Sequence, residues 1–421
     1  MNKIKFDKLD ETLYSYEHHT GVKVYMVSKP GFAKFSASFS THFGSIDNTF
    51  VPIGENEMIT VPDGVAHFLE HKVFEQEDGG NVFEMFGKLG ASANAYTSFN
   101  MTNYYFWATD NYEENLKTLI KFVQAPYFTT ENVGKEQGII GQEIGMYDDD
   151  PNWRCYFNML QGLYSEHPVR LDIAGTVDSI SKITDKTLYK CYNTFYHPSN
   201  MYICVVGDFE PEKIAAVIDE ALKPLVKEKE IPRSYPEEPK GAVTHKVLQK
   251  LPVSMPIFSI GFKDSNPAGK SAPRRASVNV ALQMLFGASS QCANELYDEK
   301  ITNGYVDCDY TADEPEYAFV EISGESENPE EAGKRILETA KKAEFTDEEL
   351  EAAKNALYGA SMLVFEDSER YMQSLSKSVT SGQDMYAMFD AYMNVTREDV
   401  EKVCEEIFSD ENYCISIVKS N

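Results

Sequence analysis

The stretch VAHFLEHKVFE, residues 65–75, places two histidines four positions apart, with a glutamate directly before the second histidine. On a helix, side chains four apart lie on the same face, so His67 and His71 can present their imidazoles to one metal ion. Glu70 lies on the adjacent edge of that face, within reach of a water on the metal. The order His-x-x-Glu-His is the inverse of the usual zincin signature and predicts a hydrolytic Zn²⁺ site with Glu70 as general base.

A hydrolytic zinc ion needs a third protein ligand and one open position. The stretch KEQGIIGQEIGMYDDDP, which starts at residue 135, carries an apolar helical stripe marked by Ile139, Ile140, Ile144 and Tyr147. Glu143 falls inside this stripe, and Glu136 lies two turns earlier on the same side. A carboxylate on a buried helix face costs several kcal/mol unless it is paired or bound to a metal. Glu143 is therefore the predicted third ligand, and Glu136 is predicted to orient a ligating imidazole.

The chain contains an internal repeat with an offset of 217 residues. Asn-Tyr-Glu-Glu at 111–114 corresponds to Asn-Pro-Glu-Glu at 328–331, and Phe-Thr-Thr-Glu at 128–131 corresponds to Phe-Thr-Asp-Glu at 345–348. Both halves mix strand-like runs with long helices. The repeat predicts an α+β protein of two homologous domains, each a mainly antiparallel sheet covered by helices.

A charged, Pro-rich segment at 223–242 marks the boundary between the two halves. The predicted domains are residues 1–225 and 240–421, joined by a linker of residues 226–239. The repeat offset places Met284, Gly287 and Ala288 at the positions that correspond to His67, Glu70 and His71, and no histidine lies near them. The second domain is therefore predicted to be a degenerate copy that lacks the zinc motif.

The bulk composition disfavours several classes of protein. The formal net charge of −28 argues against binding to nucleic acid or anionic membranes, and no run of about 18 apolar residues is present for membrane insertion. The negative charge is compatible with basic peptide substrates, and equally with solubility alone. The seven cysteines are scattered and never spaced Cys-x-x-Cys, which predicts free thiols and a cytoplasmic location.

The chain resembles the pitrilysin, insulinase and mitochondrial processing peptidase family of zinc metalloendopeptidases, the inverzincins. The resemblance rests on the His-x-x-Glu-His motif, the Glu136-x6-Glu143 pair, GASANAYTSFNMTNYYF at 90–106 and HPSNMYICVVGD at 197–208. It covers nearly the whole chain and is greatest for a bacterial two-domain branch with one active and one degenerate domain. It implies an endopeptidase that hydrolyses peptides or unfolded segments, with the ligands and base assigned above.

The resemblance also implies a mode of substrate binding. Family members use the strand that corresponds to part of 90–106 as an edge, to which an extended substrate adds by main-chain hydrogen bonds. Asn94 and Ala95 are accordingly the expected backbone-reading positions. Phe74, one turn after His71, is expected to help line a side-chain pocket.

One position departs from the family pattern. Active relatives place an arginine and, seven residues later, a tyrosine in a degenerate domain that faces the zinc. Here Tyr305 follows the expected glycine, but position 298 is an aspartate and no arginine lies nearby. Loss of such charge-stabilising groups typically costs about 10²–10³ in rate.

The family encloses its substrates with four domains, of which this chain supplies two. We therefore expect a heterodimer with a zinc-less homologous subunit that carries Arg and Tyr, or failing that a homodimer. An alternative from another class is a non-catalytic scaffold or assembly subunit of the same fold. The sequence does not choose between general peptide degradation and maturation of a dedicated precursor.

Overall fold

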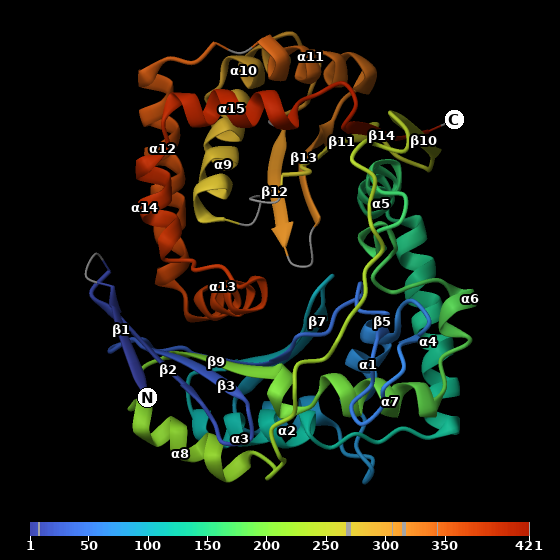
Figure 1. Cartoon of the computed structure of the whole chain (residues 1–421), viewed down its shortest axis with the longest axis vertical. Coiled ribbons are helices and arrows are strands. Elements are labelled where there is room, and N and C mark those ends of the chain that lie inside the picture. Colours follow the sequence, from blue (N-terminus) through green and yellow to red (C-terminus); the bar gives the residue numbers. More distant parts are fainter. Residues whose placement is uncertain (7–8, 267–270, 305, 314–316, 343, 421) are drawn as a thin grey trace. The chain divides into compact units, whose positions relative to one another are not determined.

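The structure is a computed structural model of the 421-residue chain, and it describes every residue except 7–8, 267–270, 305, 314–316, 343 and 421 (Figure 1). The chain forms two compact units. The first unit contains residues 1–144, 172–234 and 363–380, and the second contains residues 145–171, 235–362 and 381–421. Each unit combines a mainly antiparallel sheet with helices, which confirms the predicted α+β fold class.

The two units differ from the contiguous domains 1–225 and 240–421 predicted from the repeat. Residues 145–171 belong to the second unit, and residues 363–380 belong to the first. Each half of the chain therefore contributes one helical segment to the unit that the other half mainly builds. The predicted linker, residues 226–239, contains the point at which the chain passes from the first unit to the second.

The first unit is built on a seven-stranded sheet with the order β1-β2-β3-β9-β4-β8-β7, so that β7 forms one edge. Neighbouring strands are antiparallel, except that β3 and β9 are parallel. The strands are β1 Asn2–Phe6, β2 Glu11–Glu17, β3 Lys23–Ser28, β4 Phe35–Thr41, β7 Ala91–Thr97, β8 Thr102–Ala108 and β9 Met201–Gly207; β5 Thr49–Phe50 and β6 Ile59–Thr60 form a separate pair.

Helices cover both faces of this sheet, with α3 and α8 on one face and α13 on the other (Figure 1). The helices of the first unit are α1 Val65–Val73, α2 Val82–Lys88, α3 Tyr112–Val123, most of α4 Thr130–Asp149, α6 Val177–Ile180, α7 Asp185–Phe195, α8 Pro211–Ala221 and nearly all of α13 Ser368–Ser381. The short 3-10 helices η2 Pro198–Asn200 and η3 Leu363–Glu366 complete it.

The sequence of β4 explains why both faces are covered. Residues 35–40 alternate between Phe or Ala and Ser, and all seven residues of the strand are buried. Successive side chains on a strand point to opposite faces, so the apolar side chains face α3, and Ser36 and Ser38 face α13. Ser36 bonds Ser368 at 2.9 Å, and Ser38 bonds Ser376 at the same distance. The polar face is thus closed by hydroxyl pairs, since burying a hydroxyl without a partner is costly.

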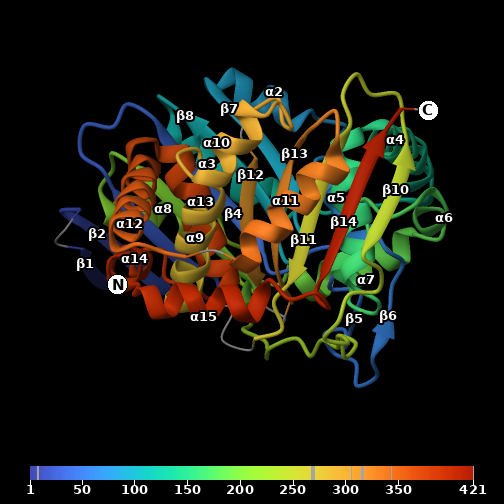
Figure 2. The ribbon, with the colours of Figure 1, turned by 90° about the horizontal axis from the view of Figure 1, so that it is seen from above.

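The second unit is built on a five-stranded sheet with the order β10-β14-β11-β13-β12, which is visible from above (Figure 2). Its strands are β10 Lys246–Lys250, β11 Ile257–Lys263, β12 Asp307–Asp313, β13 Tyr317–Glu325 and β14 Tyr413–Lys419, and only β10 and β14 pair in parallel among them. Its helices are α5 Pro151–Leu163, α9 Ala272–Phe286, α10 Gln291–Asp298, α11 Pro329–Lys342, α12 Asp347–Met362, α14 Ala387–Asn394 and α15 Arg397–Ile407, with the 3-10 helix η1 Pro168–Arg170.

Helix α5 packs on this second sheet as α13 packs on the first. The two helices begin 217 residues apart, which is the repeat offset. The thiol of Cys155 on α5 donates to the Ser416 carbonyl at 3.5 Å. Gly261 on β11 permits the close approach, because a Cβ there would lie 2.1 Å from Met159 Sδ. The exchange of helices is therefore built into equivalent positions of both halves.

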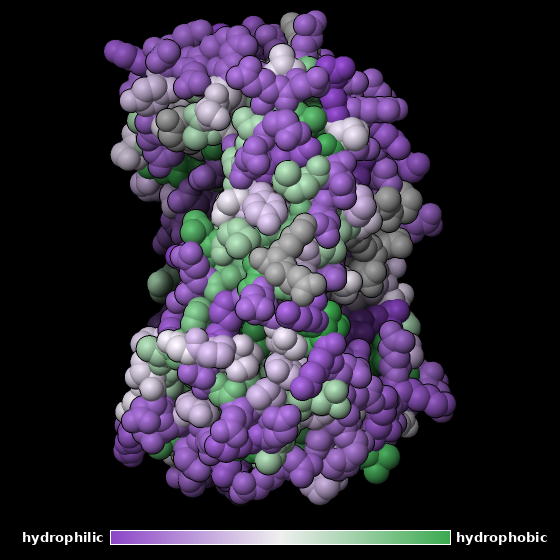
Figure 3. All heavy atoms as spheres, turned by 90° about the vertical axis from the view of Figure 1, so that its left-hand side faces the viewer, coloured by the Kyte–Doolittle hydropathy of each residue, from purple (hydrophilic) through white to green (hydrophobic). Residues whose placement is uncertain are grey.

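The surface is mainly hydrophilic on the face shown in Figure 3, where apolar residues are interspersed among polar ones. This agrees with the net charge of −28. Within the described ranges of the chain, no helix is both long enough and apolar enough to cross a membrane.

Candidate metal centre

Helix α1 carries the His-x-x-Glu-His motif and is buried over most of its length. Its apolar side chains belong to the core of the first unit, so His67 is only 7% exposed and His71 is half-buried. The helix starts after Gly64, which has a φ of 87°. A Cβ at Gly64 would lie 2.4 Å from the Ala174 carbonyl oxygen, so only glycine allows the chain to enter the helix here.

Three residues bring their donor atoms together between α1 and α4. His67 Nε2 lies 3.6 Å from Glu143 Oε1, and His71 Nε2 lies 3.4 Å from Glu143 Oε2. The donor atoms of the three residues all lie within 4.8 Å of one another. A tetrahedral zinc ion with bonds of about 2.0–2.1 Å separates its ligand atoms by about 3.3–3.4 Å. The donor set therefore fits one zinc ion in chemistry and in spacing.

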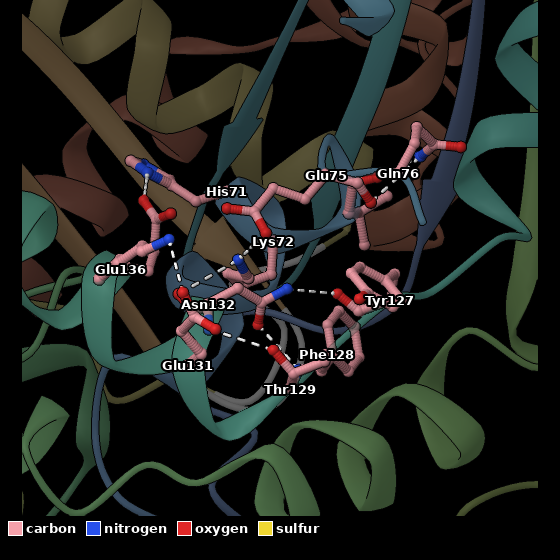
Figure 4. Close-up of polar contacts among 12 residues, drawn as sticks. His71, Lys72, Glu75, Gln76, Tyr127, Phe128, Thr129, Glu131, Asn132 and Glu136 are labelled. Atoms are coloured by element: carbon pink, nitrogen blue, oxygen red, sulfur yellow. Dashed lines mark hydrogen bonds and ion pairs between the residues drawn. The ribbon is translucent and has the colours of Figure 1, made fainter. Parts of the chain in front are cut away.

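Glu136 lies beside the imidazole ring of His71 (Figure 4). Its Oε1 accepts a hydrogen bond from His71 Nδ1 at 3.0 Å, and the side chain is buried. This bond keeps the ring proton on Nδ1 and directs the Nε2 lone pair towards Glu143. Burial alone lowers the pKa of His71, but the Glu136 bond and the neighbouring carboxylates outweigh burial and raise that pKa.

The apolar stripe predicted on α4 is only partly correct. Ile140 and Ile144 are buried, but Ile139 is 55% exposed. One residue step turns a helix by about 100°, so Ile139 lies outside the face that Ile140 and Ile144 define. Glu136 lies on the buried face and Glu143 lies half-buried at its rim. The prediction for the two carboxylates depends on that buried face and not on Ile139, and their roles at a metal stay predictions.

Glu70 lies half-buried at the edge of α1, next to β7. Its Oε2 accepts a hydrogen bond from Thr97 Oγ1 at 2.6 Å. Two buried tyrosines lie close by, and the hydroxyls of Tyr104 and Tyr196 bond each other at 2.7 Å. Burial, followed by the contact with Tyr196 and the charge of Glu70, holds the pKa of Tyr104 well above its usual range. Both phenols thus stay neutral beside the predicted base.

Sequence reasoning missed Lys72, which follows His71 directly. Its side chain is fully buried, and Nζ lies 2.5 Å from Glu75 Oε2 and 3.4 Å from the Asn132 carbonyl oxygen (Figure 4). Asn132 belongs to the first turn of α4, one turn before Glu136, so the ammonium links the end of α1 to the start of α4. The signal in the sequence was a lysine in an apolar helical run with an acid three residues later.

The two residues predicted to hydrogen-bond to the main chain of a substrate lie on the edge strand β7. Asn94 and Ala95 are on β7, and the side chain of Asn94 is exposed. Asn94 Oδ1 accepts a hydrogen bond from the Ala95 amide at 2.9 Å. A substrate strand that accepts a hydrogen bond from the Ala95 amide would have to displace Asn94 Oδ1 as the acceptor.

Phe74 lies against other aromatic rings and also faces an open pocket. Its ring stacks on Phe83 at 4.7 Å and on Phe122 at 5.2 Å. The pocket has a volume of about 540 Å³ and is lined in part by Phe74, Phe83, Tyr127 and Asn132. Its walls come from the segment after α1 and from the start of α4.

Tyr305 lies outside the described residues, so its predicted role remains a prediction. Position 298, where the family resemblance led us to expect an arginine, is the aspartate that ends α10. One more group in the described part of the chain brings possible metal donors together, namely His18, His19 and Asp219. His18 Nδ1 and Nε2 bond Thr20 Oγ1 at 2.8 Å and Asp219 Oδ1 at 2.9 Å, which accounts for the buried ring.

Fold and donor set together define a class of protein, in which two homologous α+β domains follow one another and the first carries an inverted zincin helix. Family models agree with this division. Residues 54–177 match the insulinase model of peptidase family M16, and residues 182–357 match the model for the peptidase M16 inactive domain.

Relatives that match most of the chain carry related names. A Bacillus subtilis protein named uncharacterized zinc protease YmfH is 43% identical over 414 residues, which cover 96% of this chain and 95% of that protein. Zinc protease PqqE of Helicobacter pylori is 28% identical over 342 residues, which cover 77% of this chain and 76% of that protein. The chain belongs to peptidase family M16, the insulinase family, which confirms the resemblance seen in its motifs.

Solved structures share the fold. An M16-like protein from Alicyclobacillus acidocaldarius superimposes with a TM-score of 0.92 at 32% identity, over 97% of this chain and 99% of that one. A protease from Helicobacter pylori superimposes with a TM-score of 0.84 at 23% identity, over 97% and 99% of the two chains.

Proposed function

We propose that the chain is the catalytic subunit of a zinc-dependent endopeptidase that hydrolyses peptides or unfolded segments. The observation that carries the proposal is the meeting of His67, His71 and Glu143 at the ligand spacing of one zinc ion. The relatives named zinc proteases support it. When bound, zinc would lower the pKa of the attacking water and polarise the substrate carbonyl.

The chain's own residues would move the proton and hold the site. Glu70 accepts a proton from the attacking water and delivers it to the leaving amine. Glu136 holds the proton on His71 Nδ1, so that Nε2 stays available as a ligand atom. Lys72 keeps the end of α1 against the first turn of the helix that supplies both glutamates.

The proposed substrate is an extended peptide that pairs with β7. Main-chain hydrogen bonds to an edge strand hold a peptide whatever its side chains are. The Ala95 amide would exchange its hydrogen bond to Asn94 Oδ1 for a hydrogen bond to the main chain of the substrate. The net charge of −28 favours basic peptides by long-range attraction.

We also propose that a partner completes the enzyme. The aspartate at 298 replaces the arginine of active relatives, which supports a heterodimer with a zinc-less homologous subunit that supplies Arg and Tyr. A homodimer is the second possibility. Light scattering coupled to size exclusion, with peptidase assays on the same fractions, tests this; full activity from a strict monomer would contradict it. The seven free cysteines support a cytoplasmic location.

Glu70→Gln tests the proposed function. Gln keeps the size of the side chain but cannot take up a proton, so turnover of a quenched-fluorescence peptide library should fall by about 10²–10⁴. Zinc content, measured by inductively coupled plasma spectrometry, should stay at that of the wild type. Unchanged hydrolysis would refute the mechanism. Zinc binding without hydrolysis by the wild type, alone and with its copurifying partner, would favour a non-catalytic assembly subunit.

A further inference from the structure

The hydrogen bond from Thr97 Oγ1 to Glu70 Oε2 is the feature from which a further role follows. At 2.6 Å it has the length of a hydroxyl that donates to an ionised carboxylate. Among the residues that the structure describes, Thr97 is the one that hydrogen-bonds the Glu70 side chain. One oxygen of the predicted base is therefore held, and the other is left for a water.

The position of the Thr97 hydroxyl is itself fixed by the hairpin of β7 and β8. Thr97 is the last residue of β7 and lies opposite Thr102 on β8. Thr102 Oγ1 donates to the Phe43 carbonyl at 2.9 Å, and the Ser98 amide donates to the Met101 carbonyl at 2.8 Å. Thr97 is also β-branched, which restricts rotation about its χ1 bond. The hydroxyl thus approaches Glu70 from a rigid support.

The other hydroxyls near Glu70 are already engaged. The phenols of Tyr104 and Tyr196 bond each other at 2.7 Å in the core. One of these phenols donates in this bond, and among the described residues neither hydrogen-bonds the Glu70 carboxylate, although the charge of Glu70 acts on both. Removal of the Thr97 hydroxyl would leave Glu70 free to rotate, with nothing in the described surroundings to restore its direction.

We propose that Thr97 is a positioning residue for Glu70, and that it ties the base to the edge strand on which the substrate is proposed to pair. The inference rests on the proposed function. Thr97 follows Asn94 and Ala95 on β7, so the strand that would receive the peptide also directs the carboxylate that would take the proton. A peptide that orders β7 would order the base with it.

Two substitutions distinguish the effect of the Thr97 hydroxyl from the effect of its branched side-chain shape. Thr97→Val keeps the branched shape without the donor, and Thr97→Ser keeps the donor. In the zinc-loaded full chain, with any copurifying partner, we expect kcat of Thr97→Val to fall by about 10-fold or more, with KM within about twofold of wild type. Thr97→Ser should recover most of this loss. The matched control Thr60→Val removes an exposed hydroxyl that bonds Thr49, and should leave both constants unchanged.

A second measurement needs no turnover. A double-mutant cycle of Thr97→Val and Glu70→Ala in the metal-free chain compares urea midpoints, and the hydrogen bond predicts that the two shifts are not additive. Additive shifts, or a wild-type kcat in Thr97→Val, would overturn the role of Thr97. A Thr97→Ser variant as slow as Thr97→Val would also overturn it. If the wild-type chain hydrolyses no peptide, either alone or with a copurifying partner, the proposed function is overturned instead. The double-mutant cycle would still decide whether Thr97 holds Glu70.

Discussion

At the scale of the residue, the candidate centre depends on which nitrogen of each imidazole faces the ion. His71 can offer Nε2 because Nδ1 is occupied by Glu136 at 3.0 Å. A partner of this kind fixes ring orientation and tautomer without touching the metal. Glu136 is therefore expected to affect metal affinity more than its distance from the reacting atoms would indicate.

Glu136→Gln should weaken zinc binding about 10–100-fold, since an amide is a poorer acceptor for the Nδ1 proton than a carboxylate. Competition with a chromogenic chelator measures the affinity. Glu131→Gln is the matched control, because Glu131 lies on the same helix with its side chain 81% exposed. Equal affinities for both variants would show that the Glu136 bond does not support the centre.

At the scale of the element, the spacing between helix and sheet is set by where side chains are small. On β11, Gly261 lets α5 lie against the sheet, with Met159 and Leu163 packed directly over it. On α4 the glycines have the opposite character, since a Cβ at Gly138 would meet no atom within 4 Å. Glycine therefore allows close packing at position 261, whereas at position 138 it only lowers the stability of the helix.

Gly261→Ala should destabilise the protein by about 1–3 kcal/mol, because the new methyl group would overlap two fully buried side chains. Gly138→Ala should stabilise it by about 1 kcal/mol through higher helix propensity. Urea unfolding of the metal-free chain measures both changes. Opposite signs are expected, and a loss of stability in Gly138→Ala would disprove the assignment of that face as open.

At the scale of the whole molecule, each unit contains one helix from the half of the chain that mainly builds the other unit. The first unit needs α13 from the second half to close the hydroxyl-bearing face of β4, and the second unit needs α5 from the first half. Neither half of the sequence therefore contains all the residues of one complete unit.

Fragments cut within the linker test this exchange. Residues 1–234 expressed alone should lack a cooperative unfolding transition, since the buried polar face would lose its partners. Expression together with residues 235–421 should restore folded material that elutes as one complex. Circular dichroism and size exclusion measure both results. A monomeric, cooperatively unfolding 1–234 fragment would show that the exchanged helix is dispensable.

A half-buried carboxyl group gives the second unit a dependence on pH. Burial, opposed by the Ser259 hydrogen bond and assisted by neighbouring aspartates, raises the pKa of Glu321 from 4.5 to about 7. The folded state then holds this proton more tightly than the unfolded state. The stabilising contribution is fully present below about pH 4.5 and is lost as the pH rises through about 7.

Glu321→Gln should remove this dependence, because the amide does not ionise. We expect the urea midpoint of wild type to fall relative to that of Glu321→Gln between about pH 4.5 and about pH 7, and the difference to stay constant above that range. Midpoints measured across this range for both proteins provide the test. Parallel curves would show that the pKa of Glu321 is the same in the folded and the unfolded protein.

Several features could be predicted from the sequence because they depend on short-range geometry. The period of the helix places His67, Glu70 and His71 on one side of α1, and the same period relates Glu136 to Glu143 on α4. The repeat offset revealed two homologous α+β domains, since both halves keep the same order of elements. These inferences needed only distances along the chain of a few residues, or a constant shift between similar segments.

Other features were decided only by the tertiary structure. The contact of Thr97 with Glu70, the link from Lys72 to the start of α4 and the exchange of α5 and α13 join residues or segments that lie far apart in the sequence. No periodicity encodes such pairs, because each arises from the way whole elements pack. The sequence by itself therefore predicted which groups bind a metal and act as a base, while the tertiary structure decided what holds those groups in place.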